Sequence, residues 1–192
     1  RNPLVMFVLG PLFIFLIRHR FAGRTASKRE RHSVYWTNLA LLGIVALMGV
    51  TIGIKAFVWV HLPIVMIASA AGVWLFYVQH QYEGVYWERH EHWDYVSLAL
   101  QGSSFYKLPK ILQWFTGNIG FHHIHHLSPR IPNYYLERCH AENPMFQEVK
   151  PITLFASVKS LTFRLWDEEG RKLVGFGYLK DLRNKHAMAS QQ

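Results

Sequence analysis

The residues of this sequence most suited to chemistry form a cluster of four histidines within five positions, His122, His123, His125 and His126. Each imidazole carries two nitrogens that need partners, so packing alone explains such a cluster poorly. In a helix, positions 122, 125 and 126 share one face, because they are three and four residues apart. Three neutral imidazoles on one face form half of a site for a transition metal such as iron or zinc. The alternative is a solvated loop that is merely rich in histidine.

The ligand type and the flanking residues narrow this chemistry further. Imidazole coordination suits a non-haem iron that activates dioxygen, because neutral ligands leave the metal electrophilic. Zinc with a hydrolytic water is the main competitor, although the His-Glu-x-x-His motif of zinc proteases is absent. Pro129 and Pro132 stop a helix soon after the histidines, so the cluster is predicted to lie at the end of a helix.

Two long uncharged runs precede the cluster and must position it. Residues 33–54 and 56–79 contain no Asp, Glu, Lys or Arg and are separated only by Lys55. As helices, both runs exceed the hydrocarbon core of a bilayer, which is roughly 30 Å thick. They are therefore predicted to be two transmembrane helices in a tight hairpin that turns at Lys55. Two buried helices of a large soluble core are the alternative.

A shorter apolar block, residues 4–17, contains Gly10 and Pro11 and is too short to span a bilayer comfortably. The segment 18–32 that follows holds one acid, Glu30, and six basic residues: Arg18, Arg20, Arg24, Lys28, Arg29 and Arg31. Such a segment belongs on the cytoplasmic side by the positive-inside rule. Residues 4–17 are therefore predicted to be interfacial or re-entrant. A spanning helix cut short by the start of the sequence is the alternative.

The predicted fold class is an all-α integral membrane protein, in which a transmembrane hairpin is followed by a cytoplasmic helical cap. The cap covers residues 80–180 and carries the histidines, and residues 181–192 form a flexible tail. The chain is thus expected to be multi-pass, with the histidine cluster on the cytoplasmic side. The net charge of +9 favours anionic lipid head groups, whereas no base-reading motif indicates nucleic acid. The single cysteine, Cys139, excludes an internal disulfide.

Residues 114–134, which contain the histidine cluster, resemble the third histidine box and its flanks in membrane fatty acid desaturases. The likeness is greatest to the Δ12/ω6 acyl-lipid branch of bacteria and cyanobacteria. Residues 76–83 upstream and 161–173 downstream also resemble that branch. Because the similarity extends over nearly the whole chain, it is far more specific than an isolated His-x-x-His-His pattern.

The resemblance implies a desaturase that uses two non-haem iron ions, dioxygen and two electrons to place a double bond in an acyl chain. The implied metal ligands are His122, His125 and His126 from the third box, with His80 as the additional ligand after the last membrane helix. The implied partners are an acyl-lipid or fatty acyl substrate, the bilayer, and an electron donor such as ferredoxin or cytochrome b5. No nucleic acid partner is implied.

The first two histidine boxes of the family are absent from this sequence. The chain is therefore predicted to be the C-terminal portion of a longer enzyme, and to be inactive alone because it lacks more than half of the ligands. Two alternatives stay open. One is a di-iron hydroxylase or ketolase acting on another lipid, and the other is a membrane metal-binding protein without catalysis.

Several neighbours of the cluster are candidates for supporting the ligands. Asn118 could orient a ligand or hold a metal-bound water, or could be a turn residue beside Gly117. His123 lies outside the box pattern and is expected either to support a ligand or to lie on the polar surface. Acidic residues that could accept hydrogen bonds from ligand imidazoles, or that are singly solvated or structural carboxylates, which is the favoured alternative for each, are Glu83, Glu88, Glu91 and Asp94. His90 and His92 are expected on the surface.

Overall fold

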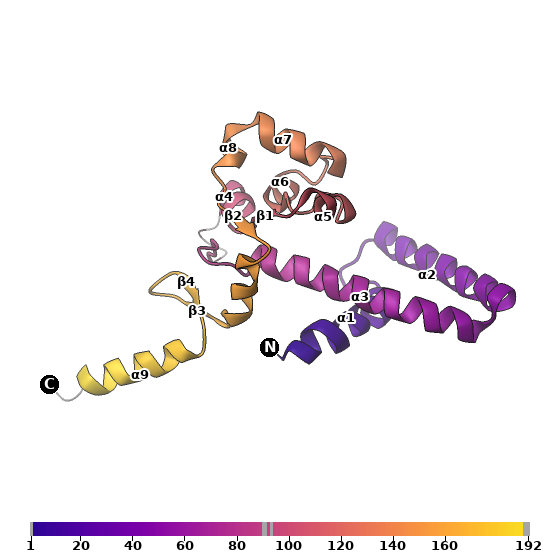
Figure 1. The fold of residues 1–192 in the computed structure, drawn as a ribbon, viewed down its shortest axis with the longest axis horizontal. Helices are drawn as coiled ribbons and strands as arrows, with labels where there is room; N and C mark the ends of the chain where they lie inside the picture. Colours follow the sequence, from indigo (N-terminus) through magenta and orange to yellow (C-terminus); the bar gives the residue numbers. More distant parts are fainter. Residues whose placement is uncertain (1, 90–91, 93, 190–192) are drawn as a thin grey trace. The chain divides into compact units, whose positions relative to one another are not determined.

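The structure is a computed structural model that describes residues 2–89, 92 and 94–189. It is mostly helical (Figure 1) and divides into two compact units, residues 1–75 and 76–192. The first unit holds the apolar runs, and the second holds the histidine cluster. The long helix α3 begins in the first unit and ends in the second.

The first unit begins with four short helical segments: η1 (Val5–Leu9), α1 (Gly10–Leu12), η2 (Phe13–Ile17) and η3 (Arg18–Arg20). The block 4–17, expected to be interfacial or re-entrant, is thus helical, and much of it has the wider π-type hydrogen bonding. Pro11 lies in the middle of the block and has no N–H to donate, so the regular α-helical hydrogen bonding between residues four apart is interrupted there.

Helix α2 spans Lys28–Met48. It starts five positions before the expected start at residue 33, because a capping box forms at Ser27. The Ser27 amide donates to Glu30 Oε2 at 2.6 Å, and the Glu30 amide donates to the Ser27 hydroxyl at 3.3 Å. These reciprocal bonds satisfy amides that the first helical turn leaves without partners.

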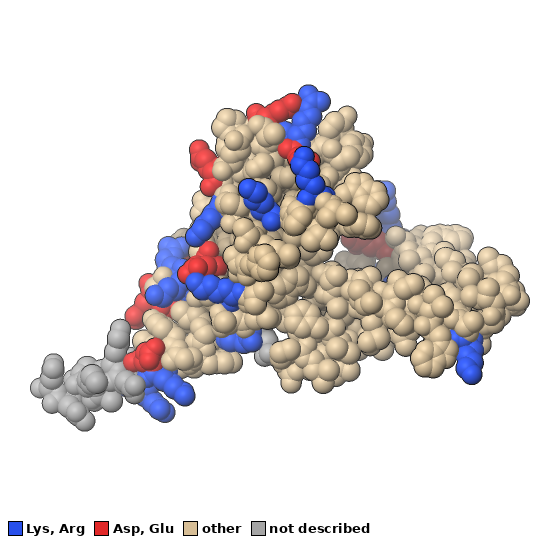
Figure 2. Space-filling view, viewed as in Figure 1, with Lys and Arg blue, Asp and Glu red and all other residues tan. Residues whose placement is uncertain are grey.

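The turn of the apolar hairpin lies at η4 (Gly49–Gly53), and α3 (Ile54–His80) follows it. The expected turn at Lys55 is therefore displaced, because Gly53 has a φ of 85° that side chains rarely adopt. Within the first unit, α2 and the first part of α3 run side by side in opposite directions (Figure 1). Pro63 does not interrupt α3. The helical segment Lys28–His80 is long and apolar enough to cross a membrane, and on the face shown in Figure 2 few charged side chains lie over it.

The second unit contains mostly short helices, of which α6 carries the histidine cluster. Their bounds are α4 (Tyr95–Gln101), α5 (Lys110–Phe115), α6 (His122–Leu127), η5 (Asn133–Tyr135), α7 (Leu136–Glu142), α8 (Pro144–Gln147), η6 (Ala156–Thr162) and α9 (Gly177–Ala189). The first part of the tail expected over residues 181–192 is helical, because α9 extends to Ala189, and the flexibility of the tail stays a prediction. Residues 178–189 contain no glycine or proline, so nothing in their composition interrupts a helix.

Two small sheets depart from the all-α expectation. Strand β1 (Phe105–Lys107) pairs in parallel with β2 (Pro151–Thr153), and β3 (Leu165–Asp167) pairs antiparallel with β4 (Lys172–Val174). Aromatic residues in β1 and β3 suit short strands, and the turn between β3 and β4 contains a glycine. A single bridge also joins Phe105 to Phe121, immediately before α6.

The apolar core of the second unit lies against α6. Phe121, Ile124, Leu136 and Phe146 form a buried cluster, and Cys139 packs against it with other partly buried side chains. Ile124 is completely buried. One face of the short histidine helix is therefore fixed by apolar packing, which leaves another face to the imidazoles.

Candidate metal centre

Three imidazoles from two helices converge in the second unit. The Nε2 atom of His122 lies 3.0 Å from Nε2 of His80 and 3.1 Å from Nε2 of His126. The candidate ligand atoms of all three lie within 4.8 Å of one another. His80 ends α3, whereas His122 and His126 lie one turn apart on α6, as their spacing predicts.

The His80 ring is oriented by its other nitrogen. Nδ1 lies 3.2 Å from the carbonyl oxygen of Gly102, which follows the last residue of α4. Because a carbonyl oxygen only accepts hydrogen bonds, this contact favours a proton on Nδ1 and a free lone pair on Nε2. The Nε2 lone pair then faces the other two histidines, as a metal-binding imidazole requires.

Helix α4 also holds α6 in place. The Tyr95 hydroxyl donates to the carbonyl oxygens of His126 and Leu127 at 2.9 and 3.0 Å. These carbonyls lie at the C-terminal end of α6, where a helix has acceptors without internal partners. Sequence reasoning did not single out Tyr95, because its spacing from the histidines carries no motif.

The chain just before α6 packs closely against Tyr106 and Gln113, and this close packing requires a glycine at position 120. A Cβ atom at this position would lie 2.6 Å from Oε1 of Gln113 and closer still to the Tyr106 carbonyl oxygen. The Tyr106 amide donates to the Gly120 carbonyl at 2.7 Å, which ties β1 to the start of the histidine helix. Buried Gln79 adds a second tie, because its Nε2 donates to the Ile119 carbonyl at 2.8 Å. Sequence reasoning missed both Gly120 and Gln79.

The electrostatics of the site keep its imidazoles neutral. Burial, followed by the neighbouring histidines His126, His80 and His125, lowers the pKa of His122 to about 3. The pKa of His126 is also lowered, first by partial desolvation of its ring, although the residue is exposed on one side, and then by the nearby imidazoles. The neutral imidazole is the form that binds metals, so at pH 7 no proton has to be displaced from the facing lone pairs.

His125 does not join the converging group. Its ring stacks on that of His122 with centroids 5.7 Å apart and an angle of 22°. It is half-buried, whereas His126 is exposed and leaves the group open on that side. Of the three third-box histidines, the structure thus brings His122 and His126 together with His80 and leaves His125 beside them.

His123 is fully buried, so the alternative of a polar surface position is wrong, and the alternative that it supports a ligand stays a prediction. The reason is helical geometry, because His123 lies next to Ile124 on the core side of α6. Its ring packs against those of Phe105, His140 and Phe146, with centroids 5.5 to 5.8 Å away. Burial, followed by the nearby His140, lowers the pKa of His123 to about 4.

The other supporting candidates have local roles. Asn118 is a turn residue with a φ of 58°, and its side-chain amide nitrogen, Nδ2, donates to the Asn133 carbonyl at 3.0 Å. Asp94 caps α4 by accepting from the Ser97 amide at 2.8 Å.

The carboxylates of Glu83 and Glu88 form ion pairs with Lys159 and Arg171, away from the ligand imidazoles. His92 is exposed, as expected. Glu91 and His90 lie outside the described residues.

The donor set fits a transition metal. The Nε2 atom of His122 lies about 3 Å from each of the other two, and sharing protons cannot satisfy all three atoms, because each neutral imidazole has only one N–H. Nitrogen ligands bound at about 2.1 Å to one metal ion lie roughly 3 to 3.5 Å from one another. A single cation among these atoms would therefore satisfy all three lone pairs.

The fold and the site together define a mostly helical protein with a long apolar helical segment and a three-imidazole group suited to a transition metal. A family model described as fatty acid desaturase matches residues 1–153, and the chain belongs to that family. A protein of Bacillus subtilis (strain 168) named fatty acid desaturase is 50% identical over 182 residues, which cover 95% of this chain and 52% of that protein. The chain thus spans about half the length of this curated relative. No solved structure matches it.

Proposed function

We propose that this chain is part of a membrane desaturase that introduces a double bond into an acyl chain with a non-haem di-iron centre, dioxygen and two electrons. The observation that carries the proposal is the convergence of His80, His122 and His126 in a member of the fatty acid desaturase family. His125 is proposed as a further ligand, because it belongs to the same box and its ring lies against that of His122.

Within this proposal, the protein's own residues hold and orient the metal ligands. Bound iron would supply the oxidising power for removing hydrogen from two adjacent methylene groups. The Gly102 carbonyl fixes the His80 tautomer, and Tyr95 fixes the end of the helix that carries His126. Burial of His122 keeps water from its ring and keeps the ring unprotonated. The open side at His126 leaves room for further ligands and for substrate.

The number of ligands bears on activity. Four histidines are too few for two metal ions with about four ligands each. We propose that the other ligands come from sequence beyond these 192 residues and that the 192-residue chain alone does not desaturate. The B. subtilis relative, of which the chain covers 52%, has room for such residues.

The proposed setting is the bilayer. The exposed apolar surface of α2 and α3 supports a multi-pass protein, and the basic residues of segment 18–32 support a cytoplasmic position for that segment and for the histidines. A substrate would then be an acyl-lipid or another fatty acyl group that reaches the site from the membrane. The Δ12/ω6 preference is proposed from the resemblance of residues 114–134, and ferredoxin or cytochrome b5 is proposed as the electron donor.

The activity is tested by expressing the full-length parent in a host that lacks the reaction and analysing its fatty acid methyl esters by gas chromatography with mass spectrometry. We expect a new double bond, lost in His122→Ala and retained in His92→Ala, which removes an exposed histidine outside the group. A new hydroxyl or keto group would instead identify a lipid hydroxylase or ketolase. Unchanged lipids from intact, metal-loaded protein would identify a non-catalytic metal-binding protein. Coexpression of each donor in turn identifies the electron source.

Topology is tested separately with the 192-residue chain. Because Cys139 is its single cysteine, a Cys139→Ser background allows one cysteine to be placed at a time. In intact cells, Lys55→Cys should react with an impermeant maleimide, whereas Arg24→Cys should react only after the cells are opened. The opposite pattern would reverse the proposed orientation.

A further inference from the structure

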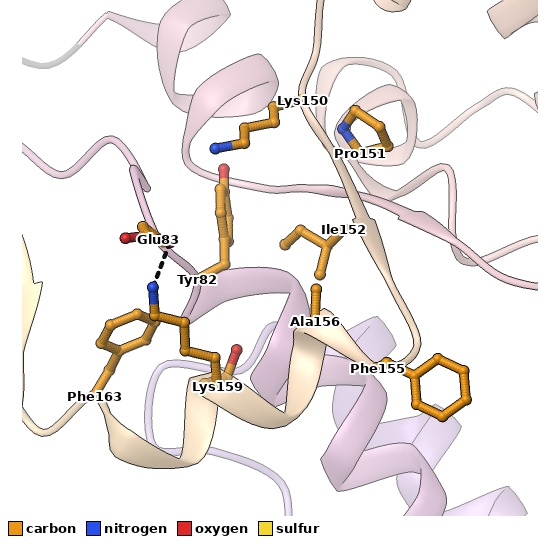
Figure 3. A pocket seen from close by; sticks show the side chains of 10 residues that line it. Tyr82, Glu83, Lys150, Pro151, Ile152, Phe155, Ala156, Lys159 and Phe163 are labelled. Carbon is orange, nitrogen blue, oxygen red and sulfur yellow. Dashed lines mark hydrogen bonds and ion pairs between the residues drawn. The ribbon is translucent and has the colours of Figure 1, made fainter.

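A cavity of about 200 Å³ lies in the second unit, between the end of α3, β2 and η6 (Figure 3). Its inner wall is formed by the buried side chains of Tyr82, Ile152 and Phe163. Glu83, Lys150 and Lys159 stand around it and are exposed. The residues proposed as metal ligands do not line this cavity, although Tyr82 follows His80 closely in sequence.

The charges around the cavity are unequal. Lys159 Nζ forms an ion pair with Glu83 Oε2 at 2.7 Å. Lys150 lies beside the hydroxyl end of Tyr82 (Figure 3), near enough to help lower the pKa of the Glu83 carboxyl. Two ammonium groups therefore face one carboxylate, and the cavity keeps a net positive charge that favours an anion.

The border of the cavity is apolar and open. Phe155, which lines it, is 87% exposed and points outward (Figure 3), and Leu154 and Val158, which are near it in sequence but do not line the cavity, are 38% and 56% exposed. Large apolar side chains next to lysines are typical of surfaces that meet the head-group layer of a bilayer. A soluble phosphate would use the lysines but would gain nothing from the exposed Phe155.

We propose that this cavity binds the phosphate head group of an anionic glycerophospholipid. In this arrangement Lys150 and Lys159 hold the phosphate, and Phe155 and Val158 contact the first part of the acyl chains. Pockets that enclose whole drug-sized ligands measure about 300 to 1,000 Å³, so about 200 Å³ suits a head group with its chains left outside. The site is distinct from the histidine group, and its occupation does not depend on metal or on desaturation.

The test measures binding to the detergent-solubilised 192-residue chain by isothermal titration calorimetry. Three probes separate the contributions: dihexanoyl phosphatidylglycerol, dihexanoyl phosphatidylcholine and glycerol 3-phosphate. We expect the phosphatidylglycerol to bind most tightly, because it combines net negative charge with apolar chains. Phe155→Ser should weaken its binding while leaving glycerol 3-phosphate unchanged.

Charge variants test the lysines in both directions. Lys150→Gln and Lys159→Gln should each weaken phosphatidylglycerol binding about five-fold, as expected for one cation near an anionic lipid. Glu83→Gln should tighten phosphatidylglycerol binding, because it removes the carboxylate that pairs with Lys159 and leaves the side chain almost the same size. Lys180→Gln, which removes an exposed cation on α9, is the matched control and should change nothing. Circular dichroism and gel filtration check that each variant is folded.

Three results would overturn the proposal. These are equal binding of the two phospholipids, binding of glycerol 3-phosphate as tight as that of phosphatidylglycerol, and binding that is absent in the unaltered chain or unaffected by both lysine variants. The second result would identify a site for soluble phosphate compounds instead. None of these outcomes bears on the metal centre, because the measurement uses metal-free protein.

Discussion

His80 and His122 face each other through their Nε2 atoms at 3.0 Å, although 42 positions separate them in the sequence. One ring lies at the end of a long apolar helix and the other at the start of a helix of six residues. A helix so short is not stable by itself, so the contact depends on the packing around α6. The stability of the second unit and its affinity for metal should therefore change together.

Removing a converging imidazole should remove metal binding. The purified 192-residue chain should bind one Co²⁺ per chain, seen in its visible absorption, because one group of three imidazoles is available in the described residues. His122→Ala should weaken this binding by more than about 10-fold, since even residues that only orient ligands contribute that much. His92→Ala is the control. Retention of the Co²⁺ spectrum in His122→Ala would contradict the assignment.

Gly120→Ala should displace the histidine helix. The added methyl group would press on the Tyr106 carbonyl and on Gln113. Overpacking of this kind costs about 1 to 3 kcal/mol in the free energy of unfolding. We expect a lower melting temperature and weaker Co²⁺ binding. Gly177→Ala is the matched control, because no atom lies within 4 Å of a Cβ there. Equal melting temperatures for both variants would show that the close approach at Gly120 is not rigid.

Tyr95→Phe should loosen the end of α6 without changing the core. The variant loses the hydroxyl that donates to the His126 and Leu127 carbonyls, at a cost of about 1 kcal/mol. We expect faster hydrogen exchange at the amides of α6 and reduced metal affinity, since His126 is then less well oriented. Tyr134→Phe, which changes an exposed tyrosine, should leave both measurements unchanged.

The metal-free chain should lose stability as the pH falls below 6.5. The pKa values of His122 and His123 are lowered to about 3 and about 4, so between pH 4 and 6.5 the unfolded chain binds protons that the folded chain excludes. The free energy of unfolding then decreases with falling pH, by up to about 1.4 kcal/mol per pH unit for each histidine. Above pH 7 neither histidine makes the free energy of unfolding depend on pH.

The same pH window separates the histidines from the carboxyl groups. Glu83 and Asp94 have pKa values below their usual 4.5 and 3.8, so their own contribution to the slope begins only as the pH approaches those usual values, where the unfolded chain takes up protons. Thermal melts between about pH 5.5 and 7 therefore measure the histidines. His123→Phe, which keeps a buried ring that cannot be protonated, should reduce the slope. A slope that is unchanged in His123→Phe would assign the pH dependence to other groups.

The sequence predicts the parts of this protein that depend on local spacing. The face shared by His122 and His126, the end of their helix before Pro129 and the helical nature of both apolar runs all follow from periodicity and composition. The helix boundaries were less accurate. The capping box at Ser27 and the left-handed backbone of Gly53 shift them, and each outweighs the simple count of uncharged residues.

The contacts between distant segments could not be predicted in this way. The Gly102 carbonyl that orients His80, the close approach at Gly120 and the burial of His123 all depend on how α4, β1 and α6 pack together. A single sequence carries no signal for such pairings. Glu83 illustrates the same limit, because a carboxylate three residues from His80 could support the ligand but pairs with Lys159 instead.

The parallel pairing of Phe105 in β1 with Pro151 in β2 has a consequence for biosynthesis. Strand β2 is made after α6, and the family match ends at residue 153, the last residue of β2. At about 5 to 20 residues per second, the ribosome adds β2 only seconds after the histidines have been polymerised. The histidines are therefore polymerised before the strand that pairs with β1 exists, and the parallel pairing of β1 and β2 has to form after β2 has emerged.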